Sequence, residues 1–504
     1  MRFAVKMSSS YKGVQNGSDV RGVVLGEKPT LTPRMVRSIA AAFALSLEER
    51  AGGEAGPVAI SVGKDSRVTG DDLSKEAMAG AVAAGADVYD LGLATTPACF
   101  MSTITPGFGY SGSIMLTASH LPYDRNGMKF FTPEGGLGKD DISAILALAE
   151  KVDKGEVPVD GAGASSGAGQ SKVDFMATYA AQLRERIVAE CNLGAAPLEG
   201  LKIVVDAGNG AGGFFARDVL APLGADVSAS QFLEPDGMFP NHVPNPEDKE
   251  AMASIQRAVV ASKADLGVIF DTDVDRSAVV DASGTLFNKN RLIAAMAAIV
   301  LRDSPGATVV TDSVTSDGLA RFIAARGGKH LRFKRGYKNV IEKGKEVDNC
   351  PLMIETSGHG ALSENHYLDD GAYMAVKMIV EAARQKGDLG ALVRGFEEPL
   401  ESAEFRVKYS EDAPADYGAG VVGGFEAFCS GGDAPKGWVS SPDNFEGWRA
   451  SVLEGKGWVL IRKSLHDPLL VINIESDEPN GVAETKKIVV DFLAKYEKLD
   501  LSHL

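Results

Sequence analysis

Strand-like apolar runs alternate with helix-like segments along most of the chain, and this alternation restricts the possible fold more than any other feature. The series begins near Pro57, restarts near Leu201 and begins a third time near Asn290. The three series share little literal sequence, so they repeat an architecture and not a short motif. Strands that alternate with helices of this length indicate a parallel or mixed sheet covered by helices on both faces. We therefore expect three comparable α/β units in series.

The sequence changes character near its C-terminal fifth. Short strand-like runs, such as Glu404–Ser410 and Leu469–Ser476, lead to a closing helix-like segment over Gly481–Leu499. This pattern indicates a smaller α+β domain. A chain of 504 residues is too long for one hydrophobic core, and about three or four domains are expected for it.

The clearest linker is Gly155–Lys172, which is rich in Gly, Ala and Ser and nearly free of large apolar residues. It separates the first α/β unit from the second. Together with the changes of pattern, it predicts four domains, over residues 1–165, 170–286, 287–398 and 399–504.

The chain is acidic, with 52 Lys and Arg residues against 68 Asp and Glu residues and a formal net charge of −16. Proteins that bind nucleic acids or anionic membranes normally present a basic face, so neither kind of partner is expected. No apolar run approaches the ~18 residues of a membrane span. A small anionic substrate stays compatible with this charge, because a local basic cluster can lie within an acidic protein.

The cysteines and the N-terminus bear on the compartment. The four cysteines form no Cys-x-x-Cys pair and are far apart, at Cys99, Cys191, Cys350 and Cys429. This spacing argues against a disulfide framework or a thiolate zinc site and favours a reducing compartment. The first residues contain no hydrophobic signal-peptide segment, so secretion is not expected. We expect a cytoplasmic protein, or one in an organelle interior such as the plastid stroma if a transit peptide was removed.

The segment FDTDVDRSAVVD contains the strongest chemical motif. Asp271, Asp273 and Asp275 alternate directly after the apolar run Leu266–Phe270. Three carboxylates this close repel one another unless a cation lies between them, and oxygen ligands favour Mg²⁺. An EF-hand matches poorly, because its sixth position needs glycine where this chain has Arg276. Arg276 suggests instead that an anionic group shares the neighbourhood of the metal. A solvated acidic turn is the simpler alternative.

A single serine stands on a shaped loop in the segment SIMLTASHLPYDRNGMKFF (Ser113–Phe131). Ser119 follows an apolar strand, with His120 beside it and Lys129 close behind. A serine at a strand end is usually a turn-former, and the absence of a Gly-x-Ser-x-Gly elbow argues against a hydrolase triad. A hydroxyl served by a metal, with Lys129 and His120 near, suits phosphoryl transfer, in which the protein mainly positions groups and neutralises charge.

A third polar loop lies in the segment MIETSGHGALSEN. It carries Glu355, Ser357 and His359 on a glycine-containing turn after the apolar run Leu352–Ile354. Acceptors and donors on one loop suit a polyol, whose neighbouring hydroxyls need paired hydrogen bonds. An ordinary polar β-turn explains the same pattern equally well.

A fourth polar loop lies in the segment GWVLIRKSLHDPLLVINIES. Arg462, Ser464 and His466 stand there between two strands. An arginine with hydroxyl and backbone donors on a tight loop is a reasonable phosphate nest. A surface hairpin is the equal alternative.

The segment DAGNGAGG matches the G-x-G-x-x-G spacing of a dinucleotide site. Gly208, Gly210 and Gly213 follow the strand-like run LKIVVD and precede a helix-like segment. A lone match of this kind also arises by chance at tight turns. A nucleotide site would leave the serine loop and the aspartate triplet unexplained, so we do not favour it.

Taken together, these stretches resemble the α-D-phosphohexomutase superfamily, the phosphoglucomutase and phosphomannomutase enzymes. The resemblance runs over nearly the full length and keeps the order of the family's motifs. The matching segments are SDVRG (Ser18–Gly22), TASHLPYDRNGMK, DTDVDR, ETSGH and RKSLHDP. The two specific segments are TASHLPYDRNGMK (Thr117–Lys129), called the serine loop below, and DTDVDR (Asp271–Arg276), called the metal loop. The resemblance implies three similar α/β mixed-sheet domains and a smaller α+β domain around a central cleft, each giving one loop.

The resemblance also implies roles for individual residues. Ser119 would carry a phosphoryl group in the active enzyme and would contact Mg²⁺ together with the three aspartates. Arg276 and Arg21 would hold the serine loop and the phosphoryl group, and Lys129, with His120 near, would serve as the general acid or base. The sugar hydroxyls and the non-reacting phosphate would be bound by a further set: Glu355, Ser357, His359, Arg462, Ser464 and His466.

Two departures from the family pattern concern the loops. The serine loop has Leu121 where the family usually has asparagine, and the C-terminal loop has Leu465 where a polar residue or glycine is usual. Phosphate binding there must rely on Arg462, His466 and backbone groups. Lys338, in the segment RGYKNV, is a further phosphate-facing candidate that would compensate.

The implied reaction interconverts hexose 1-phosphate and hexose 6-phosphate, with glucose or mannose ahead of glucosamine. Phosphoserine would donate to a hexose monophosphate, and the resulting enzyme-bound 1,6-bisphosphate would turn over and return its other phosphate to Ser119. Glucose 1,6-bisphosphate would serve as activator, and the enzyme would work as a monomer or homodimer. Two alternatives stay open: a catalytically weak sugar-phosphate-binding paralogue, and a metal-dependent phosphatase with Asp271 as nucleophile.

Overall fold

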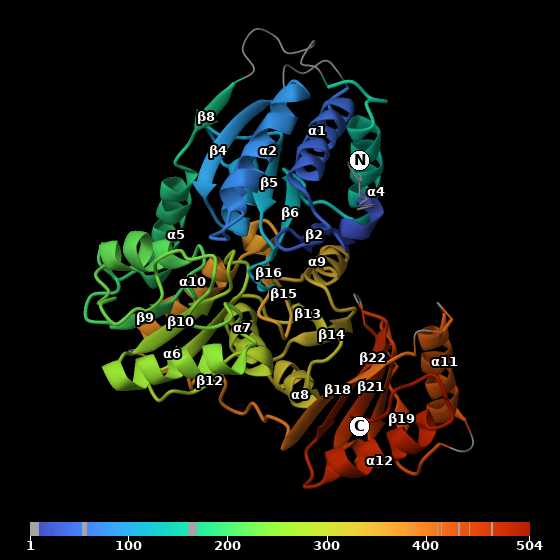
Figure 1. The fold of residues 1–504 in the computed structure, drawn as a ribbon. Coiled ribbons are helices and arrows are strands. Elements are labelled where there is room, and N and C mark those ends of the chain that lie inside the picture. The colour runs from blue at the N-terminus through green and yellow to red at the C-terminus, as the bar shows by residue number, and fades with distance from the viewer. Residues whose placement is uncertain are drawn as a thin grey trace. The chain divides into compact units, whose positions relative to one another are not determined.

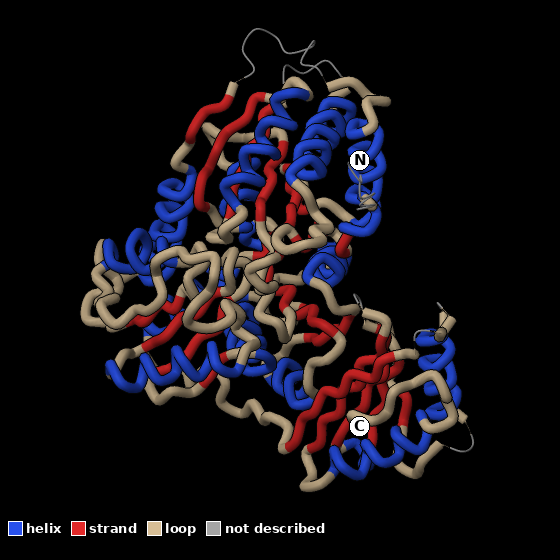
Figure 2. Tube along the Cα trace, in the orientation of Figure 1, coloured by secondary structure: helices blue, strands red, loops and turns tan. Residues whose placement is uncertain are grey.

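The computed structural model describes residues 10–504 except 53–57, 160–168, 386, 411, 415, 432–433, 443 and 465–466. The chain divides into two compact units, each made of two pieces of sequence. Unit 1 comprises Met1–Asn288 and Ser357–Leu389, and unit 2 comprises Lys289–Thr356 and Gly390–Leu504. Figure 2 shows the strands gathered into separate sheets with the helices packed around them.

The first sheet of unit 1 is mixed. Its order is β1(Gln15–Asn16), β2(Asp19–Val23), β6(Arg125–Thr132), β5(Gly112–Leu116), β3(Ala59–Lys64), β4(Asp87–Leu93) and β8(Gln170–Lys172), with β7(Gly135–Gly136) paired to β6. The strands β5, β3, β4 and β8 run parallel, whereas β1, β2 and β6 pair in antiparallel fashion. The sheet therefore has the parallel centre that the alternating pattern predicts.

Helices cover both faces of this sheet, and those of one face are labelled in Figure 1. The helices α1(Pro33–Arg50), α2(Gly70–Ala83) and α4(Lys139–Asp153) bury one face, in a core that includes Ile60, Ile114 and Phe130. The opposite face carries α3(Thr96–Ile104), whose Ser102 Oγ lies 2.7 Å from Ser61 Oγ on β3. A short 3₁₀ turn, η1(Tyr11–Val14), precedes the sheet.

The second sheet of unit 1 has the order β12(Leu286–Phe287), β11(Ser277–Asp281), β10(Leu266–Phe270) and β9(Ile203–Asp206). The strands β9 and β10 are parallel, and β10, β11 and β12 are antiparallel. Its helices are α5(Phe175–Cys191), α6(Lys249–Ser262) and α10(Gly371–Arg384), with the turns η2(Phe215–Leu220) and η3(Ala221–Leu223). The antiparallel pair β16(Gly360–Leu362) and β17(Leu368–Asp369), with η4(Ser363–Asn365) between its strands, leads into α10.

Unit 2 contains a parallel sheet and an antiparallel one. The parallel strands are β14(Lys329–Phe333), β13(Thr308–Asp312) and β15(Leu352–Ile354), with α7(Lys289–Asp303), α8(Asp317–Ala325) and α9(Tyr337–Glu346). The antiparallel sheet has the order β18(Glu401–Lys408), β22(Leu469–Ser476), β21(Gly457–Lys463), β20(Trp448–Val452) and β19(Val439–Ser440). It packs with α11(Tyr417–Ser430) and α12(Gly481–Leu493), and η5(Leu453–Gly455) joins β20 to β21.

Many helices begin at a side-chain cap. The capping oxygen accepts a hydrogen bond from the backbone N–H three residues later, which satisfies a donor that the helix itself leaves free. The capping residues include Thr32, Thr95, Asp174, Asp248, Ser316 and Asp370. These local choices agree with the pattern of apolar residues that follows each of them.

The predicted α/β class with mixed sheets is confirmed, and the antiparallel sheet with two helices matches the expected C-terminal α+β region. The four domain boundaries and the central cleft stay predictions. Residues 160–168 of the predicted linker lie outside the described residues. Within the part of the chain that the structure describes, no helix combines the length and the apolar character needed to cross a membrane.

Candidate active site

Ser119 lies in the loop that joins β5 to β6 in unit 1. The backbone of Ser119 has φ of +50°, in the left-handed region that non-glycine residues seldom adopt. Its N–H donates to Thr117 Oγ at 2.9 Å, and the residue is only 2% exposed. The loop thus holds one hydroxyl in a buried, strained and fixed position, as residues at functional sites often are.

The hydroxyl of Ser119 meets charged groups from the metal loop, although the two loops are far apart in the sequence. Arg276 Nη2 donates to Ser119 Oγ at 2.7 Å. Ser119 Oγ in turn donates to Asp271 Oδ2 at 3.0 Å, and His120 Nδ1 lies 3.3 Å away. Serine, arginine and carboxylate therefore form one cluster within unit 1.

The three aspartates of the metal loop follow β10 and precede β11. Asp271 and Asp273 are fully buried and Asp275 is 1% exposed. One carboxylate oxygen of each lies within 4.8 Å of the others. A cluster of three buried carboxylates needs positive charge nearby, because charge buried without a partner costs several kcal/mol.

Close backbone contacts from two neighbouring segments fix the shape of the metal loop. A Cβ atom on Gly210 would lie 2.6 Å from the carbonyl oxygen of Thr272, and the neighbouring Ala211 N–H donates to that same oxygen at 2.8 Å. A Cβ atom on Gly371 would lie 2.6 Å from the carbonyl carbon of Arg276. The glycine-rich segment Gly208–Gly213, which has the spacing of a dinucleotide site, therefore packs against the backbone of the metal loop.

Two basic side chains balance part of the aspartate charge. Arg276 Nε donates to Asp271 Oδ2 at 3.0 Å. Lys129 Nζ lies 3.2 Å from Asp273 Oδ2 and forms a hydrogen bond to Asp275 Oδ2. Burial opposes the charged form of Asp275, but Lys129, His359 and Arg276 outweigh it and hold its pKa below the usual range. Burial, reinforced by the neighbouring Asp275, raises the pKa of Asp271.

The residues present fit a magnesium ion. The donor set is three carboxylates, which are the hard oxygen ligands that Mg²⁺ prefers. Asp273 Oδ1 and Asp275 Oδ1 are buried and have no hydrogen-bond partner among the described residues. Buried polar atoms nearly always have a hydrogen-bond partner. Two unpaired carboxylate oxygens within one buried cluster are therefore suited to bind a cation.

His120 lies between two arginines. Arg276 Nη2 donates to His120 Nδ1 at 2.6 Å. Arg21, which donates to Ala118 O at 3.4 Å and pairs with Asp19 at 2.8 Å, also approaches the serine loop. Burial and the charges of Arg276 and Arg21 lower the pKa of His120 to about 2. His120 is therefore neutral at physiological pH and acts as a hydrogen-bond acceptor.

This state of His120 predicts how stability depends on pH. An unfolded chain binds a proton at His120 below about pH 6.5, whereas the folded chain does not, so folding stability falls as pH decreases below 6.5. His120→Asn, which keeps an acceptor toward Arg276, removes this contribution. Between pH 8 and pH 5 the unfolding free energy of the wild type should fall by about 2 kcal/mol more than that of the variant. Equal pH slopes in urea titrations of the two proteins would contradict the buried neutral state.

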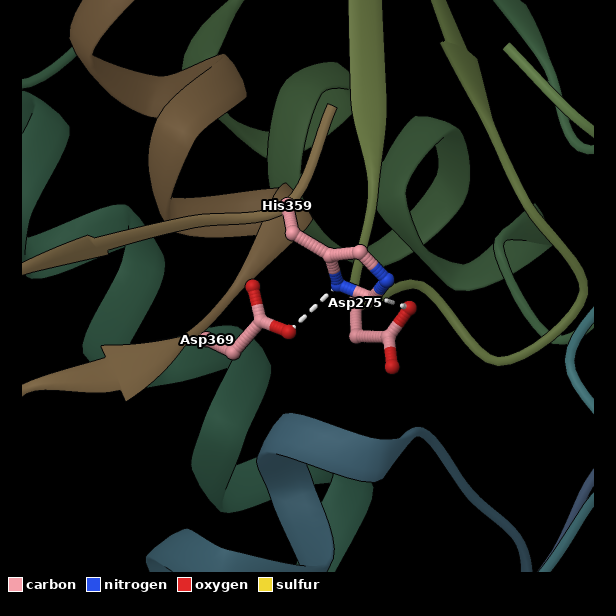
Figure 3. Close-up of side chains that lie close together, drawn as sticks. All are labelled: Asp275, His359 and Asp369. Carbon is pink, nitrogen blue, oxygen red and sulfur yellow. Dashed lines mark hydrogen bonds and ion pairs between the residues drawn. The ribbon is translucent and has the colours of Figure 1, made fainter. Parts of the chain in front are cut away.

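His359 lies beside the metal loop and is held by a carboxylate that the sequence analysis did not single out (Figure 3). Its Nδ1 donates to Asp369 Oδ2 at 2.5 Å and lies 3.8 Å from Asp275 Oδ1. Burial opposes the charged imidazolium, but Asp369 and Asp275 outweigh it and raise the pKa of His359 to about 9. His359 is therefore positively charged at neutral pH and faces the aspartate cluster.

The predicted sugar and phosphate residues are divided between the two units. Glu355 belongs to unit 2, where its Oε1 accepts from Gly336 N–H at 2.7 Å, and Ser357 belongs to unit 1. Lys338 Nζ pairs with Glu342 at 3.0 Å on α9. Ser464 Oγ accepts from the N–H of Asp467 at 3.2 Å. His466 and Leu465 lie outside the described residues.

Arg462, the predicted phosphate-binding arginine, faces a carboxylate in unit 2. Its Nη1 lies 3.6 Å from Glu446 Oε1, and its Nε is buried without a hydrogen-bond partner among the described residues. The other oxygen, Glu446 Oε2, accepts from Ser313 Oγ at 2.7 Å and from Arg335 N–H at 3.0 Å. Arg462 thus has an N–H group available to bind a phosphate, and the Glu446 carboxylate lies close to its guanidinium.

The structure brings together, in unit 1, nine predicted residues: Ser119, His120, Lys129, Arg276, Arg21, His359 and the three aspartates. Sequence reasoning missed Asp369, Thr96 and Glu446. Thr96 donates to Asp273 Oδ2 at 2.5 Å from the first turn of α3. In the sequence, Thr96 is part of a Thr-Pro pair that indicates only the start of a helix. Asp369 is only the residue before the helix cap Asp370. Neither residue therefore had a local pattern that indicated a functional site.

Three family models match the chain in succession. They are described as phosphoglucomutase/phosphomannomutase, alpha/beta/alpha domain I, domain II and domain III. The matched residues are 12–156, 177–284 and 288–399. The serine loop lies within the first match and the metal loop within the second.

Known proteins are similar over nearly the full chain. A phosphomannomutase/phosphoglucomutase of Pseudomonas aeruginosa is 31% identical over 472 residues, 93% of each chain. A phosphoglucosamine mutase of Sphingopyxis alaskensis is 29% identical over 438 residues, 86% of this chain and 89% of the relative. The crystal structure of a phosphoglucomutase/phosphomannomutase family protein from Burkholderia thailandensis has a TM-score of 0.78 and 27% identity, and the match covers 97% of this chain and 98% of that one. The resemblance noted in the sequence is thereby confirmed: the chain belongs to the α-D-phosphohexomutase superfamily and is an isomerase, a phosphohexomutase of the phosphoglucomutase/phosphomannomutase type.

Proposed function

We propose that the protein interconverts the 1-phosphate and 6-phosphate of glucose and mannose through phosphorylated Ser119 and an enzyme-bound 1,6-bisphosphate. The observation that carries this proposal is the contact of Ser119 Oγ with Arg276 and Asp271 inside the buried aspartate cluster. A phosphoryl group on this oxygen would meet an arginine donor and the ligand set for Mg²⁺. Phosphoryl transfer depends mainly on such positioning and charge stabilisation.

In the first half-reaction the free hydroxyl of a hexose monophosphate attacks the phosphorus of phosphoserine. The new sugar O–P bond forms while the Ser119 Oγ–P bond breaks, and the hydroxyl proton ends on Ser119 Oγ. Lys129, whose ammonium pairs with the aspartates, would relay it: it gives a proton to Oγ as general acid and takes up the hydroxyl proton. Arg276 stabilises the charge that develops on Oγ, because it donates to that oxygen. Mg²⁺ held by the three aspartates would supply further positive charge next to the phosphoryl oxygens.

In the second half-reaction Ser119 Oγ attacks the other phosphate of the bisphosphate and the sugar O–P bond breaks; Lys129 gives a proton to the departing sugar oxygen and takes up the proton of the Ser119 hydroxyl. One serine has to meet both ends of the sugar, so the intermediate has to turn over between the two transfers. His359, positively charged at neutral pH, is suited to contact the sugar phosphate beside the aspartates. Arg462, Ser464, His466 and Lys338 would bind the phosphate that is not reacting, and Glu355 and Ser357 the sugar hydroxyls.

The phosphatase alternative is less well supported. It requires a free Asp271 carboxylate as nucleophile, yet both oxygens of Asp271 are engaged, Oδ1 by Arg276 N–H at 3.2 Å and Oδ2 by Ser119 Oγ at 3.0 Å. A phosphatase would also leave the strained, hydrogen-bonded Ser119 without a purpose. A glucosamine phosphate substrate is the second candidate within the mutases, since the relative from Sphingopyxis alaskensis is named a phosphoglucosamine mutase.

The test is conversion of three substrates by the purified protein with Mg²⁺ and a catalytic amount of glucose 1,6-bisphosphate. We expect ³¹P NMR to show glucose 1-phosphate and mannose 1-phosphate passing to the 6-phosphates, with glucosamine 1-phosphate slower. Faster conversion of glucosamine 1-phosphate would favour the second candidate. Release of inorganic phosphate as the main product, or no conversion of any of the three, would contradict the proposal.

The Glu446 carboxylate gives a prediction about the phosphate site. A negative charge 3.6 Å from Arg462 competes with a substrate phosphate for the same guanidinium. Glu446→Gln keeps an acceptor for Ser313 and Arg335 but removes this charge, so KM for hexose 1-phosphate should fall by about threefold to tenfold at low ionic strength. Glu398→Gln, which removes an exposed carboxylate paired with Arg291 in the same unit, is the matched control and should leave KM unchanged. An unchanged or higher KM for Glu446→Gln would show that Glu446 does not compete with the phosphate.

The cysteines support a proposal for the compartment. All four are free and buried, which suits a reducing environment, and we place the protein in the cytoplasm, with the interior of an organelle such as the plastid stroma as the alternative.

A further inference from the structure

One arginine outside the motifs binds the serine loop through its backbone. Arg67 follows β3, in the turn before α2, and its side chain is 0% exposed. Its guanidinium donates to four carbonyl oxygens, three in the loop between β5 and β6 and one on the first residue of β6. They belong to Ser119 at 2.5 Å, Leu121 at 2.6 Å, Pro122 at 2.7 Å and Arg125 at 2.9 Å.

Arg67 is itself held in place from two sides. Asp65 Oδ2 accepts from Arg67 Nε at 3.2 Å, and Asp65 Oδ1 accepts from the N–H of Arg67 at 3.0 Å. The guanidinium carries five N–H donors in a rigid planar fork, and these contacts engage all three of its nitrogens. The ring of Phe239 lies 5.3 Å from the guanidinium carbon. Arg67 is therefore a fixed point to which the loop is attached.

The loop needs such an attachment because its backbone does not belong to the sheet. Ser119 has φ of +50°, a conformation that a non-glycine residue keeps only when its surroundings enforce it. A carbonyl bound at Ser119 fixes the orientation of the peptide that follows, and with it the direction of the Ser119 side chain. Two further bound carbonyls in the loop, and one at the start of β6, hold the rest of the loop against rotation.

We propose that Arg67, held by Asp65, is a positioning residue that sets the direction of Ser119 Oγ toward Arg276 and Asp271. The inference rests on the proposed function, because it assigns Ser119 as the reacting group. Arg67 touches the loop carbonyls and not the hydroxyl, so it acts on the reaction only through the placement of Ser119. Loss of the attachment should lower the rate of phosphoryl transfer and leave the affinity for the sugar phosphate nearly unchanged.

The test variant is Arg67→Lys, which keeps the charge but replaces a planar fork by a single ammonium that cannot reach four carbonyls. We expect kcat to fall about 100-fold, the scale on which a misplacement of about 1 Å acts, with KM within about threefold of the wild type. Uptake of phosphate on Ser119 from glucose 1,6-bisphosphate should slow by the same factor as kcat. Hydrogen exchange followed by mass spectrometry should show faster exchange in peptides covering residues 119–125 but not in those covering β5.

A matched control and a milder variant separate positioning from general stability. Arg332→Lys alters a partly buried arginine, 21% exposed, that also donates to backbone carbonyls, those of Thr315 and Ser316, but in unit 2. It should lower the melting temperature and leave kcat at 25 °C within about twofold. Phe239→Leu removes the ring beside Arg67 without removing a hydrogen bond. Phe239→Leu should give the same exchange pattern with a smaller loss of kcat. It takes the place of Arg67→Lys as the test variant if Arg67→Lys folds poorly.

Two results would overturn the inference. One is unchanged exchange of residues 119–125 in a folded Arg67→Lys protein. The other is faster exchange there with kcat unchanged. If the wild type takes up no phosphate on Ser119, the proposed function fails instead, and the attachment of the loop is still judged by hydrogen exchange alone.

Discussion

Ser119→Ala is expected to lower kcat by at least about four orders of magnitude, the scale on which removal of a covalent nucleophile acts. The hydroxyl is the atom that receives and returns the phosphoryl group, and no other residue in the cluster can replace it. Asp271 and Arg276 would stay in place in the variant, because most of their contacts are with other residues. The measurement is conversion of glucose 1-phosphate under conditions that saturate the wild type.

The matched control for this substitution is Ser113→Ala on β5. Ser113 is also fully buried and hydrogen-bonded, to Ser61 at 2.7 Å, but lies outside the aspartate cluster. It should cost about 1 kcal/mol of stability through the lost hydrogen bond and leave kcat within about twofold. A Ser119→Ala protein that retains more than a few per cent of the wild-type kcat would show that Ser119 does not carry the phosphoryl group.

Lys129→Met is expected to lower the unfolding free energy by about 3 to 5 kcal/mol in buffer with EDTA. The reason is that Lys129 is 3% exposed and neutralises Asp273 and Asp275, which its loss would leave buried beside Asp271 with less positive charge. Saturating Mg²⁺ should restore a large part of the loss, since a ligand at 100 times its dissociation constant contributes about 2.7 kcal/mol. The measurement is urea unfolding of the variant with EDTA and with Mg²⁺.

The control for Lys129→Met is Lys377→Met. Lys377 is similarly buried, at 6% exposure, and pairs with Glu190 and Glu364. This variant should also lose stability, but Mg²⁺ should restore no more than it adds to the wild type. Equal recovery in the two variants would mean that Mg²⁺ does not bind at the aspartate cluster. The unfolding free energy is measured for both variants, so the comparison does not depend on enzyme activity.

Much of the fold was open to prediction from the sequence because it depends on local pattern. The alternation of apolar strands and amphipathic helices predicted α/β units with mixed sheets, and the C-terminal region matched a smaller antiparallel sheet with helices. The linker shows where composition is insufficient. Its last residues form β8, which pairs with β4 through backbone groups, and backbone pairing requires no particular side chains.

The candidate site was predictable to the extent that a residue belonged to a recognisable motif. The serine loop and the metal loop were identified separately from their own residues, and the family resemblance suggested that they meet. The structure places their side chains in hydrogen-bond contact although Ser119 and Asp271 are 152 positions apart. The separation of two residues in the sequence does not show whether they are in contact. Such a contact can be inferred only when the fold that contains both loops is known.

The residues that sequence reasoning missed act through tertiary contacts. Arg67 stands in a turn after a strand, where a charged residue is ordinary, and only the folded chain places the serine loop around it. Asp369 precedes a helix cap, and its role appears only where His359 approaches it. Glu446 lies in an irregular loop and is distinguished by its tertiary contacts with Arg462, Ser313 and Arg335.

Mass spectrometry of the protein after incubation with Mg²⁺ and glucose 1,6-bisphosphate tests the central claim most directly. Intact mass and peptide analysis would be compared between the wild type and Ser119→Ala. The mechanism predicts one added phosphate, located on the peptide that contains Ser119 and absent from the variant. A folded wild-type protein that binds Mg²⁺ but carries no phosphate on Ser119, or carries it on Asp271, would contradict the mechanism.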